Sequence, residues 1–396
     1  MTVLDRRRLL QGSAVMGGLG IMGLGGCATA SGSLLAAGPT VYPINARRDR
    51  IFDITVCLRP FRAAGPRLDT EMIGDTLVVH NYGHGGSGWS LSWGSSTIAV
   101  QKAMAGGPRE VAVLGCGALG LTSATLLQRA GAKVTIYARD LLPQARSARA
   151  TGSWTPDSRI ALKAAAGPGF AALWEQMART SFKTYRSYLG LPGKPVEWND
   201  RYSVSDYEPN SPAAPPPPAD PLGFGDDYHD SIADLTPKRE LLSKEEAPWD
   251  APFVYRSSSM MFNIHDYGHT LMADFFAAGG QFQRMEFSSP SQLAQLKEKV
   301  VVNCPGYGGR ALWKDESIVP VRGQISWLIP QSEVTYGVQY KNVSLLSRTD
   351  GIVVQAVEGG DMKGYKDDHE VVDTAETDHA VAVVQELYGR FRARRV

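Results

Sequence analysis

Residues 110–120 read Glu-Val-Ala-Val-Leu-Gly-Cys-Gly-Ala-Leu-Gly, and this stretch decides the fold. The run Glu110–Leu114 has the length and the β-branched, apolar character of a buried strand. A helical pattern follows over 121–129, Gly131 ends it, and residues 133–137 form a second strand-like run. A strand, a Gly-rich turn, a helix and a second strand predict a βαβ unit of the dinucleotide-binding type.

The glycines of this turn have the GxGxxG spacing. Gly115 allows the tight turn, Gly117 lets the backbone approach a pyrophosphate, and Gly120 lets the helix pack against the strand. The free N–H groups and the positive end of the helix then face the phosphates. Asp140, after the second strand, is the candidate for the ribose hydroxyls. The motif does not separate FAD from NAD, and a tight turn that binds nothing is the alternative.

Composition narrows the class of protein. The chain has 396 residues, 43% hydrophobic and 20% charged, which suits a globular protein of one large or two ordinary domains. Its 41 basic and 40 acidic residues give a net charge of +1, which gives no indication of nucleic acid as a partner. Four cysteines without a CxxC or Cys/His cluster indicate neither a disulfide scaffold nor a metal site.

The first 27 residues resemble an export signal. Three arginines at 6–8 precede an apolar, Gly-rich stretch that is too short for a convincing transmembrane helix. The arginines resemble a twin-arginine signal, and residues 24–27, Leu-Gly-Gly-Cys, resemble a lipoprotein cleavage box with Cys27 as the lipid-bearing residue. A plain signal peptide with an incidental cysteine is the alternative. We expect a periplasmic protein anchored to the membrane as a lipoprotein, with residues 28–48 as a tether.

Two unusual segments precede the βαβ unit. After a strand near 51–58, Arg59, Arg62 and Arg67 lie among prolines and make a rigid, positive loop. Residues 80–94 then read His-Asn-Tyr-Gly-His-Gly-Gly-Ser-Gly-Trp-Ser-Leu-Ser-Trp-Gly. Such glycine density suits a backbone that packs directly against a ligand.

The later part of the chain alternates helical and strand-like patterns. Prolines over 209–222 predict an exposed insertion. Helices are expected over 171–189, 267–278 and 378–394. Strands are expected over 299–303 and 319–328, with antiparallel strands within 333–357.

Together these segments resemble the D-amino acid oxidase family of FAD-dependent oxidoreductases, from about residue 51 onward. The most specific part is the string at 80–88, His-Asn-Tyr-Gly-His-Gly-Gly-Ser-Gly. The Arg-Pro segment at 59–68 and the segments 301–306 and 321–324 also match. The resemblance implies FAD, rather than NAD, as the cofactor.

The resemblance also implies an α/β fold in two discontinuous domains. A Rossmann-like FAD-binding domain would consist of residues 80–190 and 285–325. A second, α+β domain with an antiparallel sheet would roof the substrate, from residues 50–79, 191–284 and 326–396.

The order of the segments departs from the family. There the βαβ unit opens the chain, and the Arg-Pro and HNYGHGG segments close it. Here those closing segments come first, at 57–94. This order predicts a circularly permuted chain, which is physically reasonable because the termini of a domain often lie close together. A partial copy completed from elsewhere is the alternative.

The resemblance implies roles for the site residues. Arg59 matches the arginine that pairs with the substrate carboxylate, and Gly86 matches the residue whose carbonyl accepts the substrate amine. Tyr336 and Tyr340 reproduce a Tyr-x-x-x-Tyr pair, with Tyr340 on the carboxylate and Tyr336 covering the site. Two exposed aromatic residues on a hairpin are the alternative. The implied cofactor contacts are Gly85, Gly86, Gly88, Trp89, Ser90, Gly115, Gly117, Ala118, Leu119, Gly120, Arg139, Asp140 and Gly152.

The expected reaction is the oxidation of D-amino acids to 2-oxo acids, ammonia and hydrogen peroxide, by hydride transfer to flavin N5. We expect neutral side chains, because no further arginine is clearly placed to read a side-chain carboxylate. No general base is required, and His84 is expected to be structural. The alternatives are a flavin dehydrogenase of D-amino acids, glycine or secondary amines with a membrane electron acceptor, and a non-catalytic flavoprotein. Association into a homodimer is left open.

Overall fold

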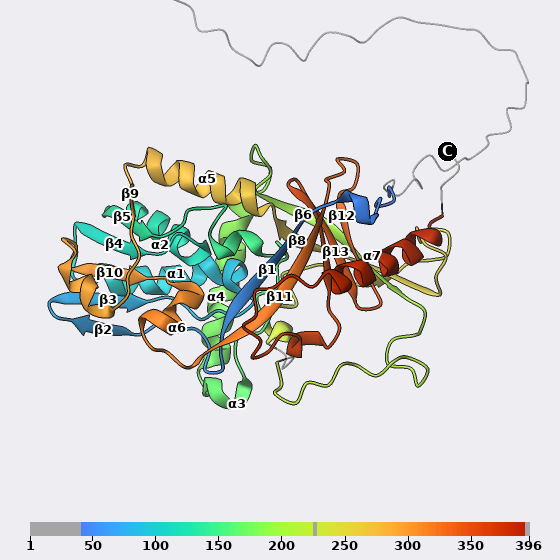
Figure 1. Ribbon diagram of the computed structural model, residues 1–396, viewed down its shortest axis with the longest axis horizontal. Helices are drawn as coiled ribbons and strands as arrows, with labels where there is room; N and C mark the ends of the chain where they lie inside the picture. Colours follow the sequence, from blue (N-terminus) through green and yellow to red (C-terminus); the bar gives the residue numbers. More distant parts are fainter. Residues whose placement is uncertain (1–40, 225–227, 393–396) are drawn as a thin grey trace, which may run out of the picture. The chain divides into compact units, whose positions relative to one another are not determined.

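The computed structural model describes residues 41–224 and 228–392, which belong to one compact unit built on two sheets (Figure 1). The expected export signal at 1–27 and the first part of the expected tether lie outside the described residues. None of the helices in the described part of the chain is long and apolar enough to cross a membrane.

The first sheet is mostly parallel. Its strand order is β2-β3-β10-β4-β5-β9, and only the edge pair β2–β3 is antiparallel. The strands β4 and β5 and the helix α2 between them are the predicted βαβ unit. The elements are β2 (Thr70–Ile73), β3 (Thr76–His80), β4 (Glu110–Leu114), α2 (Ala118–Arg129), β5 (Lys133–Ala138), β9 (Gln281–Arg284) and β10 (Val300–Asn303).

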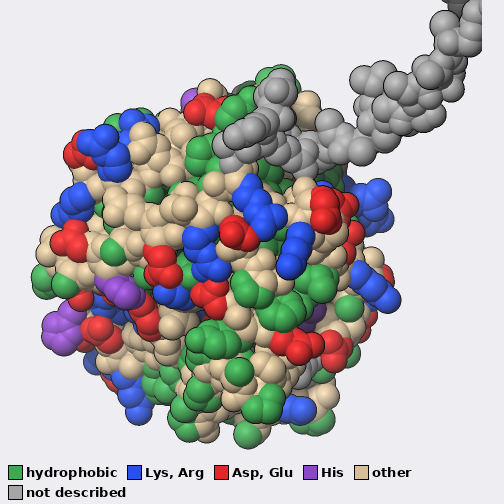
Figure 2. All heavy atoms as spheres, turned by 90° about the vertical axis from the view of Figure 1, so that its right-hand side faces the viewer, with side chains coloured by type: hydrophobic (Ala, Val, Ile, Leu, Met, Phe, Trp, Pro, Cys, Tyr) green, Lys and Arg blue, Asp and Glu red, His purple; other side chains and the backbone are tan. Residues whose placement is uncertain are grey.

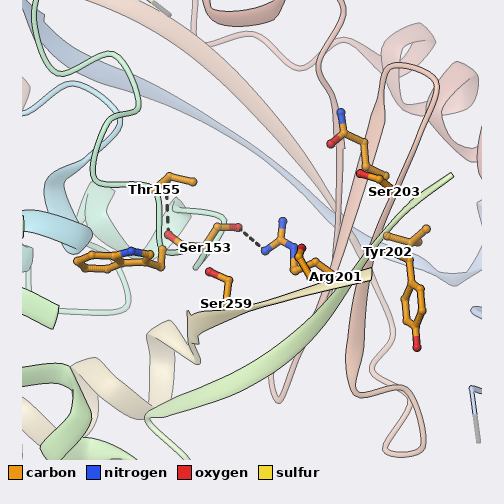
Figure 3. A pocket seen from close by; sticks show the side chains of 10 residues that line it. Ser153, Thr155, Arg201, Tyr202, Ser203 and Ser259 are labelled. Carbon is orange, nitrogen blue, oxygen red and sulfur yellow. Dashed lines mark hydrogen bonds between the residues drawn. The ribbon is translucent and has the colours of Figure 1, made fainter. Parts of the chain in front are cut away.

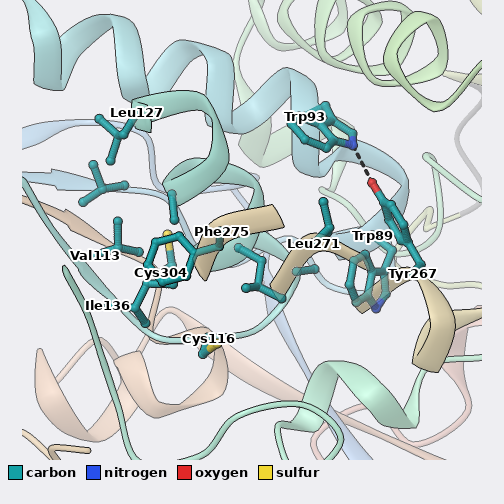
Figure 4. Close-up of a cluster of buried hydrophobic side chains, with 14 of the residues drawn as sticks. Trp89, Trp93, Val113, Cys116, Leu127, Ile136, Tyr267, Leu271, Phe275 and Cys304 are labelled. Atoms are coloured by element: carbon teal, nitrogen blue, oxygen red, sulfur yellow. Dashed lines mark hydrogen bonds between the residues drawn. The ribbon is translucent and has the colours of Figure 1, made fainter. Parts of the chain in front are cut away.

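Two helices cover one face of this sheet, and two more pack on those helices. The helices α1 (Gly88–Met104) and α2 lie on the strands, α4 (Phe170–Tyr185) packs on α1, and α5 (Ile264–Ala277) packs on α2. Figure 4 shows the buried cluster between them, where Trp93 Nε1 donates a hydrogen bond to the Tyr267 hydroxyl over 2.6 Å. Burial raises the pKa of the Cys116 thiol in this cluster to about 12, which agrees with a packing role.

The second sheet has eight strands in the order β1-β11-β14-β13-β12-β6-β8-β7. All neighbours are antiparallel except β6 and β12, which run parallel. The helix α7 (Thr374–Gly389) covers one face, and the Asp373 side chain caps its first amides. The strands are β1 (Ile51–Arg62), β6 (Val196–Ser205), β7 (Glu240–Leu241), β8 (Phe253–Phe262), β11 (Ile318–Leu328), β12 (Tyr336–Tyr340), β13 (Val343–Arg348) and β14 (Gly351–Ala356).

Short helical turns connect these elements. The two that matter for the site are η3 (Arg146–Arg149), after β5, and η7 (Gly306–Gly308), after β10. The others are η2 (Arg48–Arg50), α3 (Lys163–Ala166), η4 (Arg186–Tyr188), η5 (His229–Ile232), η6 (Pro290–Gln295), α6 (Gly309–Leu312) and η8 (Gly360–Met362).

The predicted fold class is confirmed, but the sheets divide the chain differently from the expected domain boundaries. The sequence places β3 and β9 with the substrate domain, whereas both belong to the parallel sheet. It ends the FAD-binding domain at residue 325, inside β11, yet β11 pairs with β1 along most of its length in the antiparallel sheet. The sheet to which a strand belongs is therefore decided by hydrogen-bond partners distant in sequence, and local sequence patterns do not show these partners.

The sequence predicts that residues 41–48 belong to a loose tether, but the structure shows them packed on the second sheet. Ile44 and Ala46 are buried against the α7 side of the second sheet. Gln385 Nε2 of α7 donates a hydrogen bond to the Ala46 carbonyl over 3.0 Å. This segment is therefore a packed part of the compact unit.

Charged side chains of both signs are interspersed on the face shown in Figure 2, with hydrophobic side chains scattered between them. This mixture agrees with the net charge of +1. On that face it offers no single-signed field of the kind that attracts nucleic acid.

Candidate active site

The Gly-rich turn between β4 and α2 is tightly packed. Gly115 has a φ of +97°, and a Cβ there would lie 2.3 Å from the Cys304 carbonyl oxygen. A Cβ on Gly120 would lie 2.0 Å from the Gly115 oxygen, so only glycine lets α2 approach β4 this closely. Gly117 is the N-cap of α2 and supplies no side-chain bond to the helix. The turn therefore has the tight geometry predicted for a phosphate cradle, and the contact with phosphate stays a prediction.

An oxygen atom already lies against this cradle. The Ala118 N–H donates a hydrogen bond to Ser147 Oγ of η3 over 3.1 Å. A Cβ on Gly117 would lie 2.6 Å from the same oxygen. Because helix N-terminal amides bind phosphate oxygens in this way, the residues at the start of α2 fit the pyrophosphate of a dinucleotide. Such a group would take the place of the Ser147 hydroxyl.

The segment η3 connects the cradle to the second sheet. Trp89 Nε1 donates a hydrogen bond to the Ser147 carbonyl over 2.8 Å, and Arg149 Nη1 donates one to the Val56 carbonyl over 2.9 Å. A cofactor that extends from α2 towards β1 must therefore contact or displace η3. Trp89, expected at the cofactor, lies beside this segment.

The predicted ribose-binding position lies at the end of β5. Arg139 Nε donates to Asp140 Oδ2 over 2.8 Å, and Arg139 Nη1 also reaches Glu286. The Asp140 carboxylate is thus held at the carboxyl edge of the parallel sheet, on the side of the cradle where dinucleotides place a ribose. The contact with ribose stays a prediction.

A buried network of side-chain hydrogen bonds holds the segment from His80 to Gly88 in place. Asn81 Oδ1 accepts from Ser95 Oγ, which also lies 2.7 Å from His84 Nε2. Burial, aided by the Arg62 charge, lowers the pKa of His84 to about 3, so this ring is neutral at physiological pH. His84 is therefore a weak base, which agrees with the expected structural role.

Gly85 and Gly86 lie directly against another backbone segment. A Cβ on Gly85 would lie 1.8 Å from the Arg159 carbonyl oxygen, and the Gly86 N–H donates to the Ser158 carbonyl over 3.0 Å. The Ser87 hydroxyl donates to the same Ser158 carbonyl over 2.9 Å. Close backbone contact therefore explains the glycines here, and the predicted bond from the Gly86 carbonyl to a substrate amine stays untested.

Arg59 is a buried cation without an anionic partner in the described residues. Its guanidinium lies over Gly323, where a Cβ would come within 2.3 Å of Nη2, and Nη1 donates to the Arg322 carbonyl over 3.1 Å. Burial lowers the pKa of Arg59 below its usual value. Asp361, whose charge acts on Arg59, forms its ion pair with Arg159 instead. Such an unpaired guanidinium fits an external carboxylate.

The face of the second sheet that carries Arg59 points away from α7. On β11, Gln324 and Ser326 contact Thr377 of α7. Side chains alternate along a strand, so Gly323, and Arg59 above it, lie on the opposite face. Any substrate bound by Arg59 is therefore on that opposite face.

The structure does not bring Tyr336 and Tyr340 to this face. The Tyr336 hydroxyl donates to the Tyr42 carbonyl over 2.6 Å and lies 2.7 Å from the Tyr388 hydroxyl. The Tyr340 hydroxyl is 2.9 Å from carboxylates of Asp206 and Glu386. Their spacing places both on one face of β12, and that face packs against α7. We therefore assign neither tyrosine to the substrate.

Replacing Tyr340 by phenylalanine should affect stability rather than catalysis. The hydroxyl is buried between two carboxylates and Arg390, so its loss should lower the free energy of unfolding by ~1–3 kcal/mol. Thermal melting and the KM for the best substrate measure the two effects. A KM raised more than about tenfold with unchanged melting would return Tyr340 to the substrate site.

A cavity of about 230 Å³ opens beside β6, β8 and β12, next to residues 153–155 (Figure 3). Arg201 of β6 lines it, and Arg201 Nη1 donates to Ser153 Oγ over 3.1 Å. The sequence did not single out Arg201, because its position depends on the parallel pairing of β6 with β12. Arg201 is therefore a further arginine that lines a cavity, and the expectation of neutral substrate side chains stays a prediction.

Several known proteins are similar to this chain. The family model described as FAD dependent oxidoreductase (DAO) matches residues 110–396. A D-amino-acid oxidase of Rubrobacter xylanophilus is 28% identical over 213 residues, 54% of this chain and 57% of that protein. A D-aspartate oxidase of Cryptococcus neoformans is 44% identical over 52 residues, 13% of each protein.

A glycine oxidase structure from Geobacillus kaustophilus aligns with 72% of this chain and 81% of its own, at 13% identity and a TM-score of 0.47. The match to the Rubrobacter protein spans little more than half of that relative's length. The family model, in contrast, covers well over half of this chain. The chain belongs to the D-amino acid oxidase (DAO) family of FAD-dependent oxidoreductases.

Proposed function

We propose that this protein oxidises D-amino acids with FAD, giving a 2-oxo acid, ammonia and hydrogen peroxide. The observation that carries the proposal is Arg59, a buried guanidinium that bonds a backbone carbonyl and forms no ion pair with a described carboxylate. A planar guanidinium binds a carboxylate through two parallel hydrogen bonds, which fixes the position of the α-carbon.

The chain's own residues bind and orient the reactants. The backbone of Gly115–Gly120 and the first amides of α2 would hold the pyrophosphate, and Asp140 the ribose. Arg59 would hold the α-carboxylate, and the Gly86 carbonyl would accept a hydrogen bond from the amine. Bound FAD supplies a two-electron acceptor for the α-hydrogen and its bonding pair. The pKa of His84 is low, so the scheme assigns this residue no proton transfer. The amine would bind in its neutral form, and a side-chain base is then not needed.

Product analysis tests this function and its alternative. With a D-amino acid in air, we expect equal amounts of 2-oxo acid, ammonia and peroxide, and none of them with the L-enantiomer. Products that form only when a quinone analogue is added would instead support the dehydrogenase with a membrane acceptor. A flavin-loaded protein that forms no product from any amino acid or amine would support the non-catalytic alternative.

We also propose that the chain is circularly permuted within its family. Two observations support this: the family model begins at residue 110, and the preceding strand β3 pairs in parallel with β10 of the matched part. In addition, Tyr42 and Tyr388 both bond the Tyr336 hydroxyl, so residues early in the compact unit lie beside α7. The joint at Gly106 and Gly107 lies in open space.

A rearranged chain tests the permutation. It would begin at residue 108, join residue 392 to residue 41 through a short Gly/Ser linker, and end at residue 107. We expect it to melt cooperatively and to bind FAD like the parent chain, because every buried contact between the two parts is kept. The proposal would be contradicted if the parent chain is soluble and the rearranged chain does not fold with any linker length.

Export and lipid anchoring are further proposals, supported by the arginines at 6–8 and the Leu-Gly-Gly-Cys box. Replacing Cys27 by serine should move the protein from the membrane fraction to the soluble fraction. An unchanged distribution would mean that Cys27 carries no lipid.

A further inference from the structure

Arg348 is the last residue of β13, and its side chain is completely buried. The guanidinium bonds in two directions. Nε donates to Asp350 Oδ1 over 2.8 Å, in the turn between β13 and β14, and Nη1 donates to the Ala150 carbonyl over 2.7 Å. Nη1 also lies 3.5 Å from the Thr151 carbonyl oxygen. One side chain therefore joins the second sheet to the segment that follows η3.

The face of the second sheet that carries Arg348 is the one opposite α7. Leu346, two residues earlier on β13, packs with Trp327 in a buried cluster on that face. The Arg348 guanidinium carbon lies 4.9 Å from the centre of the Trp327 ring. Because side chains alternate along a strand, Arg348 shares this face, which also carries Arg59. The contact with residues 150–151 is therefore made on the side of the sheet where the cofactor and substrate are expected.

The segment that Arg348 bonds leads directly to Gly152, which is a predicted cofactor contact. Gly152 has a φ of +88°, and a Cβ there would lie 2.5 Å from the Phe262 carbonyl oxygen and 3.2 Å from Arg348 Cδ. The Phe262 N–H also donates to the Gly152 carbonyl over 2.7 Å. Gly152 is thus packed between β8 and the Arg348 side chain, so the position of its backbone depends on that side chain.

The hydrogen bonds from Arg348 also orient the N–H groups of this segment. In a planar trans peptide, the C=O of one residue and the N–H of the next point in opposite directions. Holding the Ala150 and Thr151 carbonyls towards Arg348 therefore directs the N–H groups of Thr151 and Gly152 away from it. Backbone N–H groups are strong hydrogen-bond donors, so their direction decides which ligand atoms the segment can bind.

The turn that carries Arg348 is held by residues outside the sheet. The Thr349 N–H donates to Asn263 Oδ1 over 2.9 Å, and Asp350 Oδ2 lies 3.1 Å from His265 Nδ1. Asn263 is the N-cap residue of α5, which packs on the cradle helix α2. The guanidinium is therefore positioned by α5 and the sheet together, which is the kind of support that a precise ligand contact requires.

We infer that Arg348 is a positioning residue for FAD, because it holds the backbone of residues 150–152 in the orientation that contacts the cofactor. Ser147, at the start of the same segment, accepts a hydrogen bond from an α2 amide. Arg348 anchors the other end, so residues 147–152 run from the predicted pyrophosphate position to the second sheet. The inference rests on the proposed function for the contact of Gly152 with FAD, and it does not depend on the substrate.

Titration of the FAD-free full chain with FAD tests the inference. In Arg348→Lys the ammonium can still pair with Asp350, but it lacks the fork that also reaches the Ala150 carbonyl. We expect the dissociation constant for FAD to rise at least ~10-fold and the visible absorption bands of the bound flavin to shift. Asp350→Asn is the matched control. It removes the partner's charge but keeps an oxygen acceptor for Arg348 and the bond to Ala150, so it should preserve both values.

The melting temperature of the FAD-free protein separates positioning from a general structural role. Both variants weaken the same ion pair, so we expect them to melt at similar temperatures while only Arg348→Lys loses affinity for FAD. An Arg348→Lys protein with the parental affinity and spectrum would overturn the inference. So would an equal loss of affinity in Asp350→Asn, or an Arg348→Lys chain that does not fold beside a folded Asp350→Asn chain. A parent chain that binds no FAD would overturn the cofactor assignment of the proposed function as well.

Discussion

Replacing Gly117 by valine should abolish FAD binding while leaving the fold intact. Gly117 has a φ of −91°, which an L-residue can adopt, so the substitution should not strain the backbone. The new side chain would occupy the space in front of the α2 amides, where only Ser147 Oγ now lies within 3 Å. Loss of two backbone hydrogen bonds to a charged pyrophosphate should weaken FAD binding by at least ~100-fold.

The measurement is the flavin content and absorbance spectrum of the purified variant, with a thermal melt of the FAD-free protein beside it. Gly106→Ala is the matched control, because its added Cβ meets nothing within 4 Å. We expect the control to purify with the parental flavin content. A Gly117→Val protein that binds FAD normally would mean that the cofactor does not use the α2 cradle.

Replacing Arg59 by glutamine should lower kcat/KM for D-amino acids by ~10²–10⁴-fold, mainly through KM. The variant removes the partner of the substrate carboxylate from a desolvated site, and truncating one member of such a pair costs ~2–5 kcal/mol. Arg59→Lys should recover only part of the loss, because an ammonium cannot form the two parallel bonds of a guanidinium.

Stability separates this role from a structural one. Because Arg59 forms no ion pair with a described carboxylate, its removal should leave the melting temperature unchanged or raise it. Arg48→Gln is the control: this exposed arginine pairs with Asp378 and should affect neither KM nor stability by much. A near-normal KM in Arg59→Gln would refute the assignment of Arg59 to the substrate carboxylate.

The sequence predicted the parts of the fold that depend on local patterns. The βαβ unit follows from strand and helix periods within some thirty residues, and the three glycines of its turn have the close contacts expected of them. The glycine density after His80 predicts a backbone packed against a ligand, whereas the structure shows another backbone segment, at Ser158 and Arg159, in contact with Gly85 and Gly86.

The errors arise where distant segments decide the outcome. Strand alternation shows that Tyr336 and Tyr340 share a face, but not which face, and α7 covers the one they occupy. Likewise, the place of Arg201 in the cavity depends on the pairing of β6 with β12, more than a hundred residues apart. The two sheets divide the chain at residues other than the expected domain boundaries for the same reason, because β1 and β11 meet only in the folded chain.

The most direct test of the account is the visible spectrum of the purified protein, recorded without oxygen before and after adding D- and L-amino acids. We predict a flavin spectrum that D-amino acids bleach and L-amino acids do not. A flavin-bound protein that no amino acid bleaches would contradict the proposed reaction. A protein that binds no flavin, even when FAD is supplied, would contradict the assignment of the Gly115–Gly120 turn to the cofactor.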